Sequence, residues 1–453
     1  MQAQTNTDFS QGSVSSNIVR LAVPMTLAQL VNVLYNIIDR IYIGRIGADA
    51  TNALTGLGVC FPIITMILAF SNLVGMGGAP LFSMRRGAGE PEEAEAILGN
   101  CFSLLLGIGV SLTVSGLLIR RPLLLALGAS ETTLPYAMSY ITIYLFGTIF
   151  VMLSLGLNQF INAQGFGTTG MLTVIIGAVL NLILDPIFIF VLHMGVRGAA
   201  CATVLSQFVS ALWTFRFLTG SKTLLRIRRQ HLHLQKQRIQ KILTLGLAGF
   251  TMNVTNSLVQ VACNSTLQIF GGDLYVGVMT VLNSVREIIM LPVNGVTSSA
   301  QPVISFNYGA ALLERVRKAI VFLTGLLTAY SLLAWGLVSL FPHFFLSIFN
   351  TDPKLLAAGV PSMHLYFFGF CFMALQFSAQ SVFTALGKSH QAIFFSIFRK
   401  GIVVIPLTLL LPHFAGLGVN GVFLAEPISN LLGGAASFST MYLTVYRKLK
   451  KQV

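Results

Sequence analysis

Twelve apolar segments follow one another along the chain, and their length restricts the possible folds. An apolar run of about 20 residues spans the hydrocarbon core of a bilayer as a single helix. Inside a bilayer every backbone N–H and C=O must be hydrogen-bonded within the protein, so only helices and closed barrels cross it. We therefore predict an all-α membrane protein with transmembrane helices near residues 19–43, 54–80, 97–119, 133–160, 170–192, 197–218, 242–270, 277–304, 318–341, 360–386, 391–413 and 418–446.

The few charged residues are distributed as in a membrane protein. Only 9% of the 453 residues are charged, against about 25% in soluble domains. The formal net charge of +14 does not indicate nucleic-acid binding. With the N-terminus placed in the cytoplasm, most lysines and arginines fall at cytoplasmic helix ends and loops. This bias predicts a multi-pass protein of the cell (plasma or inner) membrane with both termini in the cytoplasm. Its partners should include membrane lipids but no nucleic acid.

The chain is a tandem repeat of two halves. Pro80 and the run at 87–97 correspond to Pro302 and the run at 309–320, about 222 residues later. Six spans in each half is an even number, so the halves should be parallel and related by a pseudo-twofold axis along the membrane normal. We predict a first six-helix lobe at 1–218, a basic cytoplasmic linker at 219–241 and a second six-helix lobe at 242–453.

No arrangement of reactive residues indicates catalysis. The five cysteines are scattered singly, without the spacing of a zinc site or a disulfide framework. The sequence contains no nucleophile elbow, phosphate loop or HExxH motif. We therefore expect a protein that is not an enzyme and that uses no cofactor.

Two aspartates lie inside predicted spans. Asp39 and Asp185 are each set in the outer half of an apolar stretch, at 21–44 and 170–192. An ionised aspartate at mid-bilayer costs about 2.5–3.5 kcal/mol even on lenient scales. Carboxylates kept at such a cost usually bind ions, relay protons or contact charged substrates.

Other polar residues are expected at the same depth as these aspartates. Asn181 lies one helical turn before Asp185 and on the same face. Two carboxylates in one desolvated cavity cannot both be ionised cheaply, which suits proton coupling. Carboxylate, amide and hydroxyl oxygens also suit Na⁺, held by Asp39, Asn181, Asp185 and Thr203. The predicted cation-coupling cluster is Asp39, Asp185, Asn181, Tyr140 and Thr203.

Each aspartate also has a structural alternative. Asp39 could form a salt bridge with Arg40 or Arg45, although adjacent residues point about 100° apart on a helix. Asp185 could cap a helix end before Pro186. Weighed against the cost of burying these groups in a membrane, we favour the functional interpretation for both.

Several motifs resemble those of multidrug and toxic compound extrusion (MATE) transporters. They are Pro24 with Asp39, the QGFGTTGM turn (164–171), NLILDP (181–186), LPVNGVTSSAQPVISFNYGA (291–310) and RKGIVVIPLTLLLP (399–412). The resemblance runs from about residue 15 to 445. It implies twelve helices in two lobes and export of amphipathic, often cationic compounds in exchange for protons or sodium.

The resemblance also implies roles for single residues. Asn158 matches the family pattern and joins the cation-coupling set, although it lies near the inner end of its span. Independently of the resemblance, Pro24 is the predicted hinge, because proline removes a backbone hydrogen bond and lets the first span bend when Asp39 binds its ion. The seventh span carries a neutral polar stripe, so the acids favour the branch that resembles the DNA-damage-inducible-F-like members. For Glu287 we favour structural ion pairing, with Arg286, Arg399 or Lys400 as partner.

A cavity for flat cations needs acidic groups and aromatic, methionine or polar faces. For Glu426 we leave two roles open, lining the second cavity or pairing with Lys400. The predicted substrate-lining residues are Asn32, Tyr35, Asn36, Met171, Met252, Asn256, Gln260 and Glu426.

Together these observations predict an H⁺- or Na⁺-coupled antiporter that exports amphipathic organic cations by alternating access. One alternative is a flippase for lipid-linked precursors or polysaccharides in the same superfamily, which would use a basic cavity. A membrane-embedded transferase is disfavoured because the chain has no large soluble loop and no catalytic constellation. Both lobes lie in one chain, so a monomer suffices.

Overall fold

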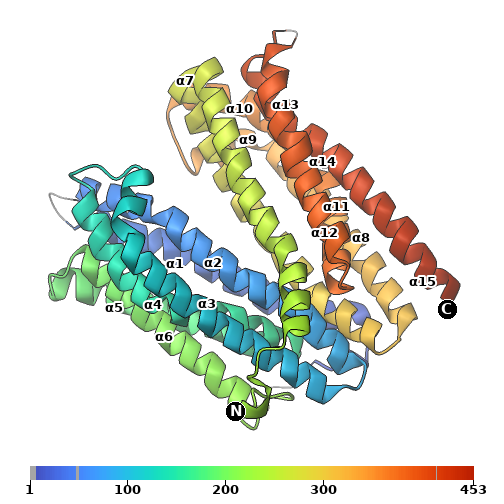
Figure 1. The fold of residues 1–453 in the computed structure, drawn as a ribbon. Coiled ribbons are helices and arrows are strands. Elements are labelled where there is room, and N and C mark those ends of the chain that lie inside the picture. Colours follow the sequence, from blue (N-terminus) through green and yellow to red (C-terminus); the bar gives the residue numbers. More distant parts are fainter. Residues whose placement is uncertain (1–6, 47–49, 415, 453) are drawn as a thin grey trace. The chain divides into compact units, whose positions relative to one another are not determined.

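The computed structural model describes residues 7–46, 50–414 and 416–452, and within these ranges the chain contains helices and no strand. Contacts divide the chain into two units (Figure 1). The first unit holds residues 7–9 and 23–246, and the second holds Ser10–Ala22 and the chain from Leu247 onward. The described linker residues of 219–241 thus belong to the first unit, and the division into three predicted domains stays a prediction.

The first unit is built around one central helix. Its helices are α1 (Val14–Ile43, from residue 23), α2 (Ala50–Gly87), α3 (Pro91–Ala126), α4 (Leu134–Ala163), α5 (Gly167–Pro186), the π-helix η1 (Ile187–Val191), α6 (Val196–Thr219), the short 3₁₀-helix η2 (Arg229–His231) and the start of α7 (Lys236–Gly309). Helix α4 contacts α2, α3, α5 and α6. A helix that is apolar all round is buried in this way.

Small residues allow these helices to approach closely. A Cβ on Gly147 of α4 would lie 2.4 Å from the Val204 side chain of α6, and one on Gly156 would lie 2.7 Å from Leu105 of α3. Helices in a membrane associate through such close van der Waals packing, because lipid tails are as apolar as leucine. These glycines therefore fix the central position of α4.

The second unit repeats this organisation. It contains most of α7, α8 (Leu313–Leu340), α9 (Pro342–Ser347), α10 (Pro353–Phe367), α11 (Phe370–Ala385), α12 (Ser389–Ile397), η3 (Phe398–Val404), α13 (Ile405–Leu410), η4 (Leu411–His413), α14 (Val419–Met441), η5 (Tyr442–Tyr446) and α15 (Arg447–Gln452). Helix α11 packs against α8 and α14. A Cβ on Gly434 would lie 2.4 Å from the Phe372 carbonyl oxygen, so α14 and α11 are in close contact.

The spans can be compared with the twelve predicted segments. In the described residues, nine helices are long and apolar enough to cross a membrane, and α10 with α11, which meet at 45°, would make a tenth. Helix α7 covers two predicted spans, because its backbone leaves the helical conformation at Gly272, where φ is +63°. Helix α14 together with η5 covers the twelfth predicted segment from residue 419 onward. Every predicted segment thus corresponds to helical structure.

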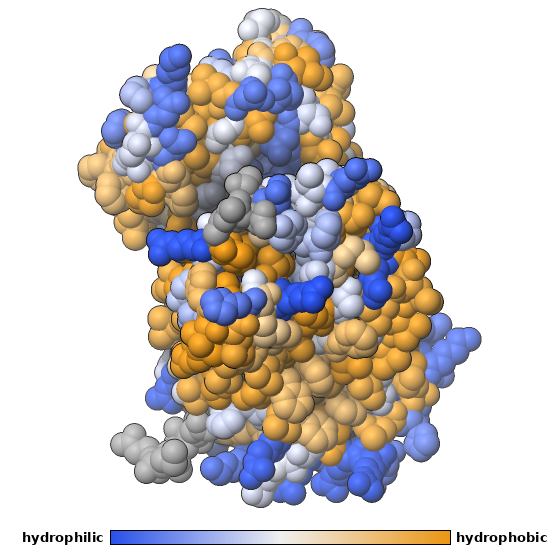
Figure 2. All heavy atoms as spheres, turned by 90° about the vertical axis from the view of Figure 1, so that its left-hand side faces the viewer, coloured by the Kyte–Doolittle hydropathy of each residue, from blue (hydrophilic) through white to orange (hydrophobic). Residues whose placement is uncertain are grey.

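The outer flanks of the helices are apolar. Leu118, Val191, Ile269 and Leu340 are each at least 70% exposed. Figure 2 shows hydrophobic side chains covering broad areas of the visible face, with hydrophilic side chains gathered in separate patches. Exposed apolar surface on this scale is what contact with lipid requires.

The linker is bound to the first unit by buried polar side chains. The fully buried Asn100 of α3 donates to the backbone carbonyls of His231 and His233 and accepts from the backbone N–H of Gln235. Gln164, at the end of α4, accepts from the backbone N–H groups of Leu224 and Leu225. Because these linker backbone groups have partners in the first unit, the linker is part of that unit's fold.

Acidic residues at the start of α3 add charge to this attachment. The Glu95 carboxylate pairs with Arg228 at 2.6 Å, and the Glu93 carboxylate accepts from the Arg238 guanidinium at 2.9 Å. The hydrogen bond from Arg238 holds the pKa of Glu93 below its usual value. A carboxyl with a lowered pKa contributes stability above its unfolded pKa. This contribution is therefore present at neutral pH and is lost as the pH falls through the lowered pKa.

We predict that Asn100→Ala loosens the linker. The change removes the partners of three buried or half-buried backbone groups, which should cost about 2 kcal/mol of unfolding free energy. Thermal unfolding in detergent should show the loss, and hydrogen exchange should rise at residues 231–235. The exposed Asn420 provides the control, and Asn420→Ala should stay within about 0.5 kcal/mol. Equal melting temperatures for both variants would contradict the attachment.

Candidate functional site

A small cavity of about 30 Å³, which several polar side chains border, lies inside the first unit. Helices α1, α4, α5 and α6 all contribute to its lining. Helix α5 presents Thr173, Gly177 and Asn181 at four-residue spacing, so one face of α5 borders the cavity. Helix α1 contributes Asn32 and Tyr35. The cavity therefore collects the polar faces of otherwise apolar helices.

Helix α1 separates its polar and apolar residues. Val23, Leu27, Leu30, Leu34 and Ile37 are each more than 40% exposed and follow one another at three- or four-residue spacing. The polar stripe that contains Asn32, Tyr35 and Asp39 lies at other positions of the same helix. One flank of α1 thus suits lipid, and the other carries the groups that a wet cavity needs.

The two aspartates predicted as a pair lie together in the structure. The Asp39 and Asp185 carboxyl groups are within hydrogen-bonding reach of each other. Asp185 is fully buried, and its Oδ1 accepts from Asn181 Nδ2 at 3.2 Å. The same amide nitrogen is 3.4 Å from Thr203 Oγ1 on α6. Three helices therefore converge on this pair.

Tyr140 completes the cluster from α4. Its hydroxyl is hydrogen-bonded to the Thr203 side chain, and its ring stacks on Tyr144 with centroids 6.0 Å apart. Asn158 takes a different place. It borders the same small cavity, but its amide donates to the Gly170 carbonyl at 3.2 Å. The structure therefore brings five of the six predicted coupling residues into one network and places Asn158 along the same cavity.

The structural alternatives for the aspartates do not match their surroundings. The Arg40 guanidinium lies over the Phe61 ring, 4.6 Å from its centre. Among the described residues, no ion pair includes Asp39 or Asp185. The chain stays helical through Pro186 into η1, so Asp185 does not cap a helix end.

The arrangement has two chemical capabilities. A hydrogen bond between two carboxyl groups needs a proton, because an ionised carboxylate only accepts. The buried oxygens Oδ1 of Asp39, Oδ2 of Asp185 and Oδ1 of Asn181 also have no hydrogen-bond partner among the described residues. Oxygen atoms of this kind are the ligands that hard cations prefer. No cluster of three or more His, Cys, Asp or Glu side chains suited to a metal occurs in the described part of the chain.

The second unit contains a larger cavity of about 390 Å³. Four of the predicted substrate-lining residues border it, namely Met252, Asn256, Gln260 and Glu426. The other four belong to the first unit. Of these, Asn32 and Tyr35 border the small cavity, while Asn36 donates to the Asn32 carbonyl at 2.7 Å. Asn36 and Met171 border neither of these two cavities, and their lining role stays a prediction.

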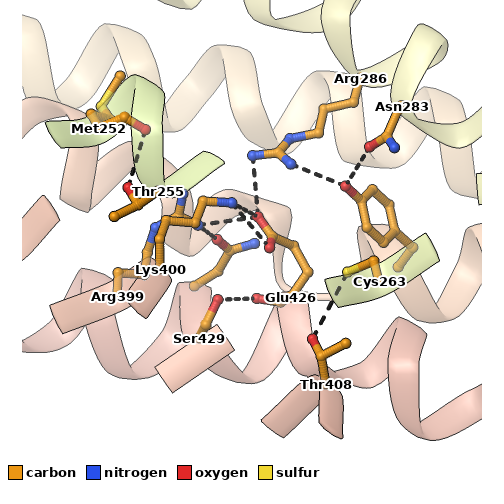
Figure 3. A network of polar contacts seen from close by, with 12 residues as sticks. Met252, Thr255, Cys263, Asn283, Arg286, Arg399, Lys400, Thr408, Glu426 and Ser429 are labelled. Carbon is orange, nitrogen blue, oxygen red and sulfur yellow. Dashed lines mark hydrogen bonds and ion pairs between the residues drawn. The ribbon is translucent and has the colours of Figure 1, made fainter. Parts of the chain in front are cut away.

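Glu426, and not Glu287, is the acid that pairs with the basic residues of this cavity (Figure 3). Its carboxylate lies 3.1 Å from Arg286, 3.2 Å from Arg399 and 3.0 Å from Lys400. The expected ion pairing of Glu287 is wrong, since its side chain is exposed and none of the described residues pairs with it. Both roles left open for Glu426, lining the cavity and pairing with Lys400, are present.

Several residues of the two sites were not predicted. In the small cavity Ser154 Oγ lies 2.7 Å from Gln207 Oε1. In the larger cavity Tyr366 accepts from Arg286 at 3.0 Å and donates to Asn283 at 3.2 Å. A polar residue within an apolar span was the available signal for these side chains.

Comparisons with known proteins agree with this architecture. The model of the MatE family matches residues 24–187 and 250–410. The "Multidrug export protein MepA" of Staphylococcus haemolyticus (strain JCSC1435) is 25% identical over 411 residues, which cover 90% of this chain and 89% of that protein. An outward-facing multidrug resistance MATE family transporter of the MOP superfamily is 24% identical with a TM-score of 0.91, covering 99% of this chain and 100% of the other. A MATE structure in the bent conformation is also 24% identical, with a TM-score of 0.92 and 99% of both chains covered.

We predict that Glu426→Gln destabilises the second unit. Removing the charge leaves three basic side chains without their carboxylate, and breaking a buried ion pair typically costs about 3–5 kcal/mol. Glu287→Gln is the matched control, because it neutralises an exposed acid in the same cavity and should change stability by about 0.5 kcal/mol or less. Thermal unfolding in detergent measures both variants. Equal effects would show that the network around Glu426 contributes no stability.

Proposed function

The chain belongs to the MatE family and is a membrane transporter rather than an enzyme, and we propose that it is an antiporter that exports amphipathic, mostly cationic organic compounds in exchange for H⁺ or Na⁺. The names of its relatives support export of several compounds, since they are multidrug export proteins. For the same reason the alternative of flipping a lipid-linked precursor is not favoured. In this proposal transport requires the coupling ion and no resident cofactor.

The observation that carries the proposal is the contact between the Asp39 and Asp185 carboxyl groups. Both groups lie inside predicted spans, and Asp185 is fully buried. Such a pair favours the uptake of one positive charge, as H⁺ or as Na⁺ between its free oxygens. Cations that need the same negative charge compete for it, so binding the coupling ion weakens binding of an organic cation. This reciprocal coupling is what exchange requires.

Helix α1 is the element proposed to respond to the ion. Its residues before Val23 group with the second unit and those from Val23 with the first, so the change of unit falls beside Pro24. Proline removes one backbone hydrogen bond within a helix and permits bending. One similar structure is a MATE transporter in the bent conformation, and we assign the corresponding bend in this chain to Pro24. Ion binding at Asp39 would then bias the bend of α1.

The same proposal includes the placement of the protein. We place it as a monomer in the cell membrane with both termini in the cytoplasm, which puts the basic linker beside anionic lipid. The bias of lysines and arginines along the sequence supports this orientation.

We predict that Asp39→Asn and Asp185→Asn abolish coupled transport. Each change removes one carboxylate from the pair. The rate of gradient-driven ethidium transport across the proteoliposome membrane should fall at least about tenfold, because a charge-assisted contact is lost. A pH gradient and a Na⁺ gradient, imposed separately, identify the coupling ion. Asp352→Asn is the control, because asparagine caps α10 as well as the exposed aspartate does. Transport by either pair variant at the wild-type rate would overturn the coupling site.

We also predict that Pro24→Ala slows transport several-fold without unfolding the protein. Alanine restores the missing backbone hydrogen bond and straightens the helix, so the bent form becomes less accessible. Pro122→Ala changes an exposed proline inside α3 and should leave transport unchanged. The rate of ethidium flux under the effective gradient measures both. Full activity of Pro24→Ala would remove Pro24 from the mechanism.

A further inference from the structure

The larger cavity of the second unit carries more positive than negative charge on its buried wall. Arg399 and Lys400 are 3% and 2% exposed, and Arg286 joins them at the same carboxylate (Figure 3). Glu426, 5% exposed, is the acid that meets all three. Glu287 also borders the cavity, but it is exposed and pairs with none of the described residues. Three cations thus share one buried carboxylate.

Loss of protons cannot remove this imbalance. Lysine can give up its proton when buried, but arginine stays charged in proteins. Arg286 and Arg399 alone therefore leave one positive charge after Glu426 is counted. A buried charge without a partner is costly, and proteins normally supply a counter-charge. Here the wall that needs the counter-charge borders an open cavity of about 390 Å³.

The basic groups are held in place by further contacts. Arg286 donates to the Tyr366 hydroxyl at 3.0 Å, and Arg399 donates to Asn430 Oδ1 at 2.6 Å. Gly433 fits against the Arg399 stem, since a Cβ there would lie 2.8 Å from Arg399 Cγ. The Nε of Arg399 is buried and has no hydrogen-bond partner in the part of the chain that the structure describes. The wall therefore contains fixed donors with unused capacity.

We propose that this cavity binds the anionic group of an amphipathic organic compound, a carboxylate, sulfonate or phosphate. Planar guanidinium groups match the oxygens of such anions and form strong charge-assisted hydrogen bonds with them. The apolar part of the compound rests on Met252, Val259, Met279 and Phe377, which border the same cavity. The cavity volume lies within the range of about 300–1,000 Å³ that is usual for small-molecule sites.

This site adds a second class of ligand, organic anions, to those of the proposed exporter. An anion at the basic wall and an organic cation at the Asp39–Asp185 pair are different chemistries in different units. Binding at the basic wall needs neither an ion gradient nor the two aspartates. Its test can therefore fail or succeed independently of the transport predictions.

The experiment measures binding of tritiated 1-naphthaleneacetate to the purified full-length protein in detergent, without a gradient. Unlabelled 1-naphthaleneacetate and 1-naphthyl phosphate should displace the label, whereas 1-naphthylmethylamine, with the same ring and a positive charge, should not. Dihexanoyl phosphatidic acid provides a lipid source of the same anion. If dihexanoyl phosphatidic acid displaces the label, the site also accepts lipid headgroups. If it does not, the site is specific for soluble compounds. Equal displacement by the amine would overturn the proposal.

Charge variants locate the binding in this cavity. Asn256 borders the cavity. Asn256→Asp replaces it with a side chain of nearly equal size that carries a negative charge, and leaves the ion pairs of Glu426 in place. It should weaken 1-naphthaleneacetate binding about tenfold or more, because like charges repel at close range. Asn420→Asp adds the same charge at an exposed residue outside the cavity lining and should leave binding unchanged.

A second variant tests the basic wall itself. Arg399→Gln should also weaken binding about tenfold, through the loss of a charge-assisted contact. Unchanged binding by Asn256→Asp in a protein that melts like the wild type would overturn the assignment, whatever Arg399→Gln does.

Discussion

The cost of an uncompensated charge in hydrocarbon determines how this molecule is arranged. Helices cross the membrane because their backbone groups are paired internally, and charged side chains can enter only where a partner or a wet cavity receives them. The first unit meets this requirement with two carboxyl groups in contact, Asp39 and Asp185. The second unit meets it with one carboxylate, Glu426, among three cations. The two repeats thus solve the same problem with opposite charge.

This difference in charge indicates that the two units bind different ligands. The cavity of the first unit has a volume of about 30 Å³, and the cavity of the second has a volume of about 390 Å³. An acidic pair beside a small space suits the binding of H⁺ or Na⁺. A basic wall beside a large space suits the acidic group of a larger compound.

The sequence predicts the first site better than the second, and helix geometry explains why. Asn181 and Asp185 are four residues apart, so periodicity alone places them on one face. Arg399 and Lys400 are adjacent and would point about 100° apart on an α-helix. They reach the same carboxylate within the π-helical segment η3, which the sequence does not reveal. The wrong pairing of Glu287 has the same origin, since Arg286 precedes it in sequence but faces Glu426.

The attachment of the linker has a consequence for how the protein is made. Asn100 and Gln164 receive their backbone partners from residues 224–235, which follow helix α6 in the chain. During synthesis, these hydrogen bonds can therefore form only after the linker has been made. A nascent chain that ends at residue 218 lacks the backbone groups of residues 224–235 that bind Asn100 and Gln164. The first half of the protein is thus completed by the segment that leads into the second.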